Sequence, residues 1–173
     1  MVHSIELLFD ERTEAAIRRD WAALVDAGLP SQGRHAVPTN RPHVTLAVSE
    51  RIDAGADVAL RAVAARLPLD CRVGAPVLFG SRTPTLARLI VPSVELLALH
   101  AAADETCRPY LHPGPYPHSR PGQWTPHVTL CRRLAPEQLA TAVAVIHGTD
   151  TAGTFAALRH WDGDARVAHG LNG

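Results

Sequence analysis

The sequence predicts an α+β protein built from two similar halves, and two observations lead to that expectation. The string Pro-His-Val-Thr-Leu occurs at residues 42–46 and again at 126–130. Strand-like and helix-like patterns follow one another in the same order around each copy. Two halves related by a pseudo-two-fold axis would place both strings around a common cleft. The length of 173 residues fits a single domain with a sizeable core.

The first half covers about residues 4–79. Asp10 is a suitable N-cap for its first helix, whose apolar side chains recur at helical spacing. The expected elements are, in order, a strand at 4–9, a helix at 10–27, a loop at 31–42, a motif strand at 42–49, a helix at 55–67 and a strand at 69–79.

The second half, about residues 85–161, repeats this order. Ser93 suits an N-cap and Pro136 suits a first helical turn. The proline-rich loop is unusually long, and such loops are often functional or mobile. The expected elements are strands at 85–91, 127–133, 153–161 and 166–171, helices at 93–107 and 136–147, and a loop at 109–126. The whole chain, 1–173, is therefore expected to be one domain of two repeated, intertwined lobes.

Composition argues against several classes of protein. No apolar run approaches the roughly 20 residues that cross a bilayer, and the N-terminus lacks the pattern of a signal peptide, so we expect a cytoplasmic protein with no membrane partner. We also expect a monomer. Seventeen Lys plus Arg residues balance 17 Asp plus Glu residues, which leaves no basic field for long duplex nucleic acid. Three cysteines without CxxC spacing argue against a disulfide framework and a zinc ribbon.

Each repeated string carries an imidazole and a hydroxyl on one face of a strand. Alternation places His43 with Thr45, and His127 with Thr129, above an apolar underside. Histidine titrates near neutral pH, so a facing pair can hold one neutral and one protonated ring. Such a pair can perform acid-base chemistry on a phosphodiester while the threonines hold its oxygens, and this scheme requires no metal or cofactor. The matching motifs leave open which histidine is the acid.

Two His-x-Thr motifs in a duplicated α+β chain resemble the 2H phosphoesterase superfamily, whose best-known bacterial branch is the 2′-5′ RNA ligase family. The resemblance implies a bilobal fold in which two antiparallel sheets line a central cleft, with helices outside. It implies that His43, Thr45, His127 and Thr129 are catalytic, and that no metal is needed. The implied reaction is hydrolysis of the 2′,3′-cyclic phosphate of a nucleotide or RNA end, typically to a 2′-phosphate.

Two further functions stay open. Some members of the family join RNA ends reversibly through a 2′-5′ bond, and the same cleft could serve a non-catalytic nucleotide-binding module. Retention of both motifs favours the enzyme over the binding module.

Members also often carry an arginine shortly after the second motif. Position relative to the motif favours Arg132, whereas strand alternation favours Arg133, and we choose Arg132. Phe9 and Trp124 are the aromatic candidates for stacking on a base, with core packing as the stronger alternative for Phe9. His118, in the long loop, is a further candidate for a substrate contact. The spacing of the other histidines indicates no metal site.

Overall fold

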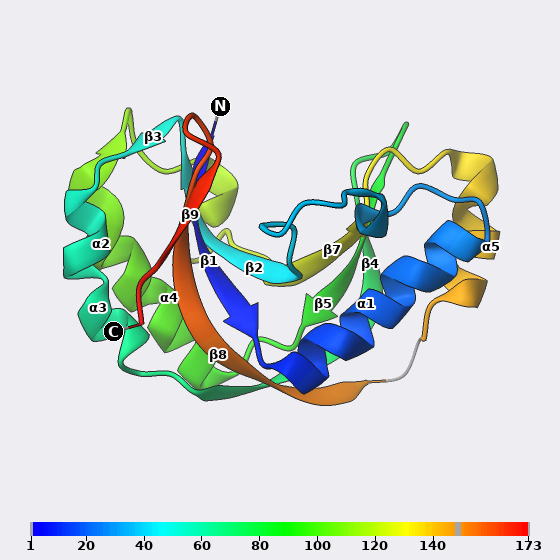
Figure 1. Cartoon of the computed structure of the whole chain (residues 1–173), viewed down its shortest axis with the longest axis horizontal. Coiled ribbons are helices and arrows are strands. Elements are labelled where there is room, and N and C mark those ends of the chain that lie inside the picture. Colours follow the sequence, from blue (N-terminus) through cyan, green and yellow to red (C-terminus); the bar gives the residue numbers. More distant parts are fainter. Residues whose placement is uncertain (1, 148–149, 173) are drawn as a thin grey trace.

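Seven strands form one continuous antiparallel sheet in the computed structural model, which describes residues 2–147 and 150–172. The sheet is bent into a U, and the helices lie along its outer sides (Figure 1). Two very short strands, β3 and β6, pair separately. The strands are β1 (His3–Phe9), β2 (His43–Ser49), β3 (Arg51–Ile52), β4 (Leu69–Phe79), β5 (Thr85–Ile90), β6 (Leu111–His112), β7 (His127–Cys131), β8 (Thr151–Asp162) and β9 (Val167–Gly170).

The order of the strands shows the duplication directly. It runs β2-β1-β8-β4-β5-β7, with β9 added beside β8, so β1, β2 and β4 of the first half correspond to β5, β7 and β8 of the second. The α+β class and the antiparallel pairing are confirmed. The two expected sheets are joined into one, because β8 pairs with β4 through residues 151–155 and with β1 through residues 155–161.

The helices match the expected segments, except that one expected helix is divided into two. Asp10 accepts a hydrogen bond from the Thr13 amide at 2.8 Å, and Ser93 Oγ accepts one from the Leu96 amide at 3.1 Å, so both predicted N-caps are present. The helix expected at 55–67 is two short helices. The helices are α1 (Glu11–Asp26), α2 (Gly55–Ala59), α3 (Arg61–Ala64), α4 (Val94–Cys107) and α5 (Leu139–Val145).

The division between α2 and α3 has a local cause. The amide of Val63 bonds to the carbonyl of Leu60, three residues earlier, which tightens the backbone into a 3₁₀-like turn where the two helices meet. The helix expected at 136–147 begins in the same way, with a 3₁₀ turn at Pro136–Gln138 before α5. Among the described residues, no helix is both long enough and apolar enough to span a membrane.

Each long helix packs against the motif strand of the opposite half. Helix α1 lies against β7, and α4 lies against β2 (Figure 1). The undersides of the two motif strands are accordingly fully buried in the hydrophobic core, as the alternation predicted. These side chains are Val44, Leu46, Val128 and Leu130.

The long loop at 109–126 is fastened to β2. The Tyr116 amide donates to the Val48 carbonyl at 3.0 Å, and Ser49 Oγ lies 2.9 Å from the carbonyls of both His112 and Gly114. Strand β6, within this loop, pairs with β3. These hydrogen bonds hold the loop beside the first motif strand.

Candidate active site

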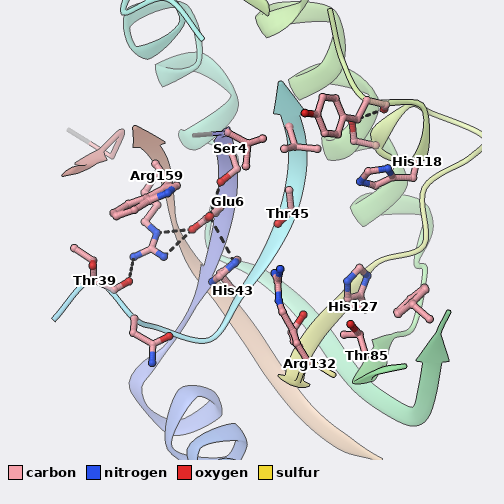
Figure 2. Close-up of a pocket in the computed structure, with 18 of the residues that line it drawn as sticks. Ser4, Glu6, Thr39, His43, Thr45, Thr85, His118, His127, Arg132 and Arg159 are labelled. Atoms are coloured by element: carbon pink, nitrogen blue, oxygen red, sulfur yellow. Dashed lines mark hydrogen bonds and ion pairs between the residues drawn. The ribbon is translucent and has the colours of Figure 1, made fainter. Parts of the chain in front are cut away.

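The two motifs come together at one cavity of about 1020 Å³ on the concave side of the sheet (Figure 2). All four motif side chains line it, and so do side chains from β1, β4, β5, β8 and both long loops. The lining includes His43, Thr45, His127, Thr129, Arg132, His118, Trp124, Phe79, Thr85, Ser4, Glu6, Arg159 and Trp161.

The two motif histidines are held in the same way. Nδ1 of His43 lies 2.7 Å from the Arg41 carbonyl, and Nδ1 of His127 lies 2.7 Å from the Thr125 carbonyl. In both cases a proline separates the two residues, and the residue before a proline favours an extended backbone. A carbonyl can only accept, so Nδ1 carries the hydrogen and Nε2 is the nitrogen left for chemistry.

The two motif threonines are also held alike, by indoles from the opposite half. Trp124 Nε1 donates to the Thr45 carbonyl at 2.9 Å, and Trp21 Nε1, from α1, donates to the Thr129 carbonyl at 3.0 Å. The hydroxyl groups of both threonines remain on the cavity side of their strands. These hydrogen bonds connect each motif strand to the half that carries the other motif.

An aromatic ring and positive neighbours surround His127. The Phe79 ring centroid lies 4.4 Å from that of His127. Desolvation lowers the pKa of His127, and the positive charges of His43, Arg132 and His118 act in the same direction, against the hydrogen bond to Thr125. The neutral form of this imidazole is therefore favoured.

A buried carboxylate lies beside His43. Glu6, from β1, is 4% exposed, and its Oε1 lies 3.6 Å from His43 Nε2 (Figure 2). Arg159 Nε donates to Oε2 at 2.7 Å, and Ser4 Oγ donates to Oε1 at 2.6 Å. Burial alone would raise the pKa of Glu6, but His43, Arg159 and the Ser4 hydroxyl together lower it below its ordinary value. Glu6 is thus an ionised carboxylate at neutral pH.

The arginine that follows the second motif is Arg132 in this structure. Arg132 lines the cavity, and Arg133 does not. Strand β7 ends at Cys131, and Arg133 has a φ of +57°, so the alternation that favoured Arg133 no longer applies there. His118 also lines the cavity, at the rim formed by the long loop.

The two aromatic candidates have different positions. Trp124 lines the cavity, but it stacks on His100 at a centroid separation of 3.9 Å and an interplanar angle of 8°. One face of its indole is therefore already covered. Phe9 is a correction to the expected substrate contacts, because it is 1% exposed and packs on Phe155 in the core. Phe9 belongs to the core cluster that also contains Ile17 and Leu24 of α1.

With this geometry in place, the comparison with protein families is decisive. The sequence profile described as the 2′-5′ RNA ligase superfamily matches residues 13–163. The chain belongs to the 2′-5′ RNA ligase superfamily. The resemblance to 2H phosphoesterases that the two motifs indicated is confirmed, and membership supports an enzyme of phosphoesterase or ligase type. A direct comparison with curated protein sequences gives no match.

Solved structures share the fold of this superfamily member at low sequence identity. The protein TT0787 of Thermus thermophilus superposes with a TM-score of 0.60 at 16% identity, covering 99% of this chain and 96% of its own. LigT of E. coli complexed with 3′-AMP gives 0.58 at 18% identity, covering 97% and 92%. Usb1 of Kluyveromyces marxianus with uridine monophosphate gives 0.53 at 12% identity, covering 99% and 97%.

The charges around the cavity of this superfamily member suit an anionic ligand. Among the described residues that line it, Glu6 is the one carboxylate, and it is paired with Arg159. Arg34 and Arg132 add positive charge to the same lining. Sequence reasoning missed Glu6 and Arg159, although a Glu inside the apolar string Ser-Ile-Glu-Leu-Leu-Phe was a signal that could have identified the first.

Proposed function

We propose that the protein is a metal-independent phosphodiesterase that hydrolyses the 2′,3′-cyclic phosphate of a nucleotide or RNA end to a 2′-phosphate. The observation that carries this proposal is the matched fixing of two imidazoles through Nδ1, which leaves both Nε2 atoms for one cavity. One imidazole that accepts a proton and one that donates a proton are what hydrolysis of a phosphodiester requires.

The proposed step balances without any further reactant. Water attacks the phosphorus and gives a proton to the Nε2 of one histidine, while the bond from phosphorus to O3′ breaks and O3′ takes a proton from the Nε2 of the other. The products are a 2′-phosphate monoester and a free 3′-hydroxyl. Proton exchange with solvent then restores both rings. Each proton transfer is worth about 10²- to 10⁴-fold in rate.

Three further side chains would hold the phosphate during this step. The Thr45 and Thr129 hydroxyls can donate to its non-bridging oxygens, and Arg132 can neutralise its charge. The cavity has room for a nucleoside as well, since ligand pockets of roughly 300–1,000 Å³ accommodate small molecules. The nucleotides named with the similar LigT and Usb1 structures support a nucleotide substrate here.

The test is hydrolysis of nucleoside 2′,3′-cyclic phosphates in EDTA by wild type, His43→Ala and His127→Ala. Each substitution is expected to lower kcat/KM by about 10²-fold or more, and ³¹P NMR should identify the 2′-phosphate as product. His169→Ala is the matched control, because His169 is exposed on β9 and does not line the cavity. Full activity in either motif variant would refute the proposal.

The family match favours 2′-5′ RNA ligation as the second candidate. Ligation is the same displacement with the 5′-hydroxyl of a second RNA end in place of water. Incubation with tRNA halves that carry 2′,3′-cyclic phosphate and 5′-hydroxyl ends would give a joined product if ligation is the main activity. Tight nucleotide binding in calorimetry without turnover in either assay would instead indicate a binding module.

A further inference from the structure

We propose that Glu6 is a positioning residue for His43, and that its place beside this ring makes His43 the acid and His127 the base of the reaction. This inference rests on the proposed function and deepens it. The two His-x-Thr motifs are identical in sequence and in their own hydrogen bonds, so a difference in role must come from the strands beside them.

The first support is the fixed position of the carboxylate. Glu6 Oε1 faces His43 Nε2 at 3.6 Å, while Arg159 holds Oε2 and Ser4 holds Oε1. The Glu6 side chain therefore cannot move away from the His43 imidazole without breaking two buried hydrogen bonds. An opposite charge at about 4–6 Å or less favours the charged form of an ionisable group, so this carboxylate stabilises the imidazolium of His43.

The second support is the different pair of side chains at the equivalent place in the other half. Glu6 lies opposite Thr45 on the neighbouring strand, and Ala87 lies opposite Thr129 in the same relation. One strand further along, Arg159 pairs with Glu6, whereas Val77 pairs with Ala87. The first motif therefore has an ion pair where the second has two apolar side chains.

The third support is the set of charged groups around each ring. His43 is faced by Glu6 from β1, by Arg159 from β8, which is bound to Glu6, and by His127 and Arg132 across the cavity. The loop before β2 adds Arg34, His35 and Arg41 to the charges near His43, and Arg41 is itself paired with Glu14 of α1.

His127 has a different set of neighbours. It is faced by His43, Arg132 and His118, all positive or able to become so, and by the Phe79 ring. A proton on His43 further disfavours a proton on His127, so we place a single charge on the pair at the ring next to Glu6.

The assignment gives each atom a role. His127 Nε2 takes the proton of the attacking water, and His43 Nε2 gives its proton to O3′ as the bond from phosphorus to O3′ breaks. The positive charge of Arg159 offsets the negative charge of Glu6, which limits repulsion between this carboxylate and the substrate phosphate. In this scheme Glu6 contacts no atom of the substrate, and it acts through the nearby Nε2 of His43.

The experiment is the pH dependence of kcat/KM for Glu6→Gln, which removes the charge and keeps the shape. The basic limb of the profile, where the acid loses its proton, is expected to move to lower pH, so activity at about pH 8 falls roughly tenfold and activity at about pH 6 falls less than threefold. The acidic limb, which reports the base, is expected to stay in place. A profile that superimposes on wild type, or a shift of the acidic limb alone, would overturn the proposal.

Asp20→Asn is the matched control. Asp20 is also a buried carboxylate paired with an arginine, Arg88, at 3.2 Å, but it does not line the cavity. This variant tests whether loss of any buried ion pair moves the profile, and neither limb is expected to shift. An equal shift in both variants would show that Glu6 acts only through stability.

NMR of wild-type protein provides a measurement that needs no variant to fold. At a pH where the pair holds one charge, the imidazole signals should show His43 protonated and His127 neutral. The reverse distribution would overturn the inference even if the enzyme is active. A wild type that does not hydrolyse cyclic phosphates would refute the proposed function, and the NMR result would still decide the charge states.

Discussion

The half of the molecule built on β1 and β2 and the half built on β5 and β7 carry the same motif in different surroundings. In both, Nδ1 of the histidine meets a carbonyl two residues earlier, and an indole from the opposite half holds the threonine carbonyl. Beside the motifs, however, the strands differ: the first motif has Glu6 on β1 and Arg159 on β8, and the second has Ala87 on β5 and Val77 on β4.

The comparison shows that the duplicated motif fixes the position of each histidine ring, while the side chains on the neighbouring strands set the charges around that ring. Hydrogen bonds from a side chain to a main-chain carbonyl can be repeated closely, because the position of the carbonyl depends on the shape of the backbone. Side chains on adjacent strands are free to differ, and one carboxylate is enough to separate two otherwise equal imidazoles. The predictions that follow probe this combination of equal geometry and unequal charge, beginning with the largest expected effect.

The buried ion pair of Arg88 with Asp20 is expected to serve a different purpose from that of Arg159 with Glu6. Arg88 with Asp20 is buried away from the cavity, where Arg88 also donates to the Gly74 carbonyl at 2.6 Å. Arg88→Met would remove the arginine partner of Asp20, which keeps the amide and ring of His147 as hydrogen-bond partners, and should lower the free energy of unfolding by about 3 kcal/mol. Urea denaturation measures this. A loss below about 1 kcal/mol would mean that the pair is not structural.

The two threonines test whether the halves hold the phosphate equally. Thr45→Val and Thr129→Val each remove one hydroxyl donor and keep the shape of the side chain. Each is expected to lower kcat/KM about 10- to 100-fold, because a hydrogen bond to a charged group is worth roughly 1.5–3 kcal/mol. Steady-state kinetics on a cyclic nucleotide measures both. A change of less than about twofold in one variant would show that only one half holds the phosphate.

The two indole hydrogen bonds between the halves should contribute equally to stability. Trp21→Phe and Trp124→Phe keep an aromatic ring and remove the donor to Thr129 and Thr45, respectively. Each is expected to lower the free energy of unfolding by about 1 kcal/mol. Thermal unfolding followed by circular dichroism would compare them, and unchanged stability in both would show that these bonds do not hold the halves together.

The Glu6 carboxylate should also affect how the free energy of unfolding changes at acidic pH. The pKa of Glu6 lies below its ordinary value of 4.5 in the folded protein, so its contribution is present above that value and is lost as the pH falls through the folded pKa. Wild type should therefore lose stability below about pH 4.5 more steeply than Glu6→Gln. Parallel curves of unfolding free energy against pH would contradict this.

Much of the fold could be predicted because its signals are local. Alternation, helical spacing and N-caps such as Asp10 and Ser93 depend on residues close in sequence, and the repeated string identified the duplication. The continuity of the sheet could not be predicted, because it depends on where β8 changes partners from β4 to β1. The fixing of the long loop depends on its contacts with β2, which sequence periodicity does not encode.

The residues of the candidate site also separate into those that local sequence could predict and those that depend on contacts between distant parts of the chain. The repeated string indicated His43, Thr45, His127 and Thr129, and all four line one cavity. Trp124, expected to be available for stacking, has one face covered by His100, which is distant in sequence. Glu6 acquires its role only because β1 lies between β2 and β8, which places it between His43 and Arg159.

The most direct test of the acid role of His43 and the base role of His127 uses a substrate whose leaving group needs no proton. A nucleoside 4-nitrophenyl phosphodiester releases nitrophenolate, so its hydrolysis depends on the base and not on the acid. His43→Ala is expected to lose at least about 10²-fold on a cyclic phosphate but less than about tenfold on the aryl ester, whereas His127→Ala loses about 10²-fold on both. Equal losses for the two variants on the aryl ester, or rescue of His127→Ala instead, would contradict unequal roles for the two identical motifs.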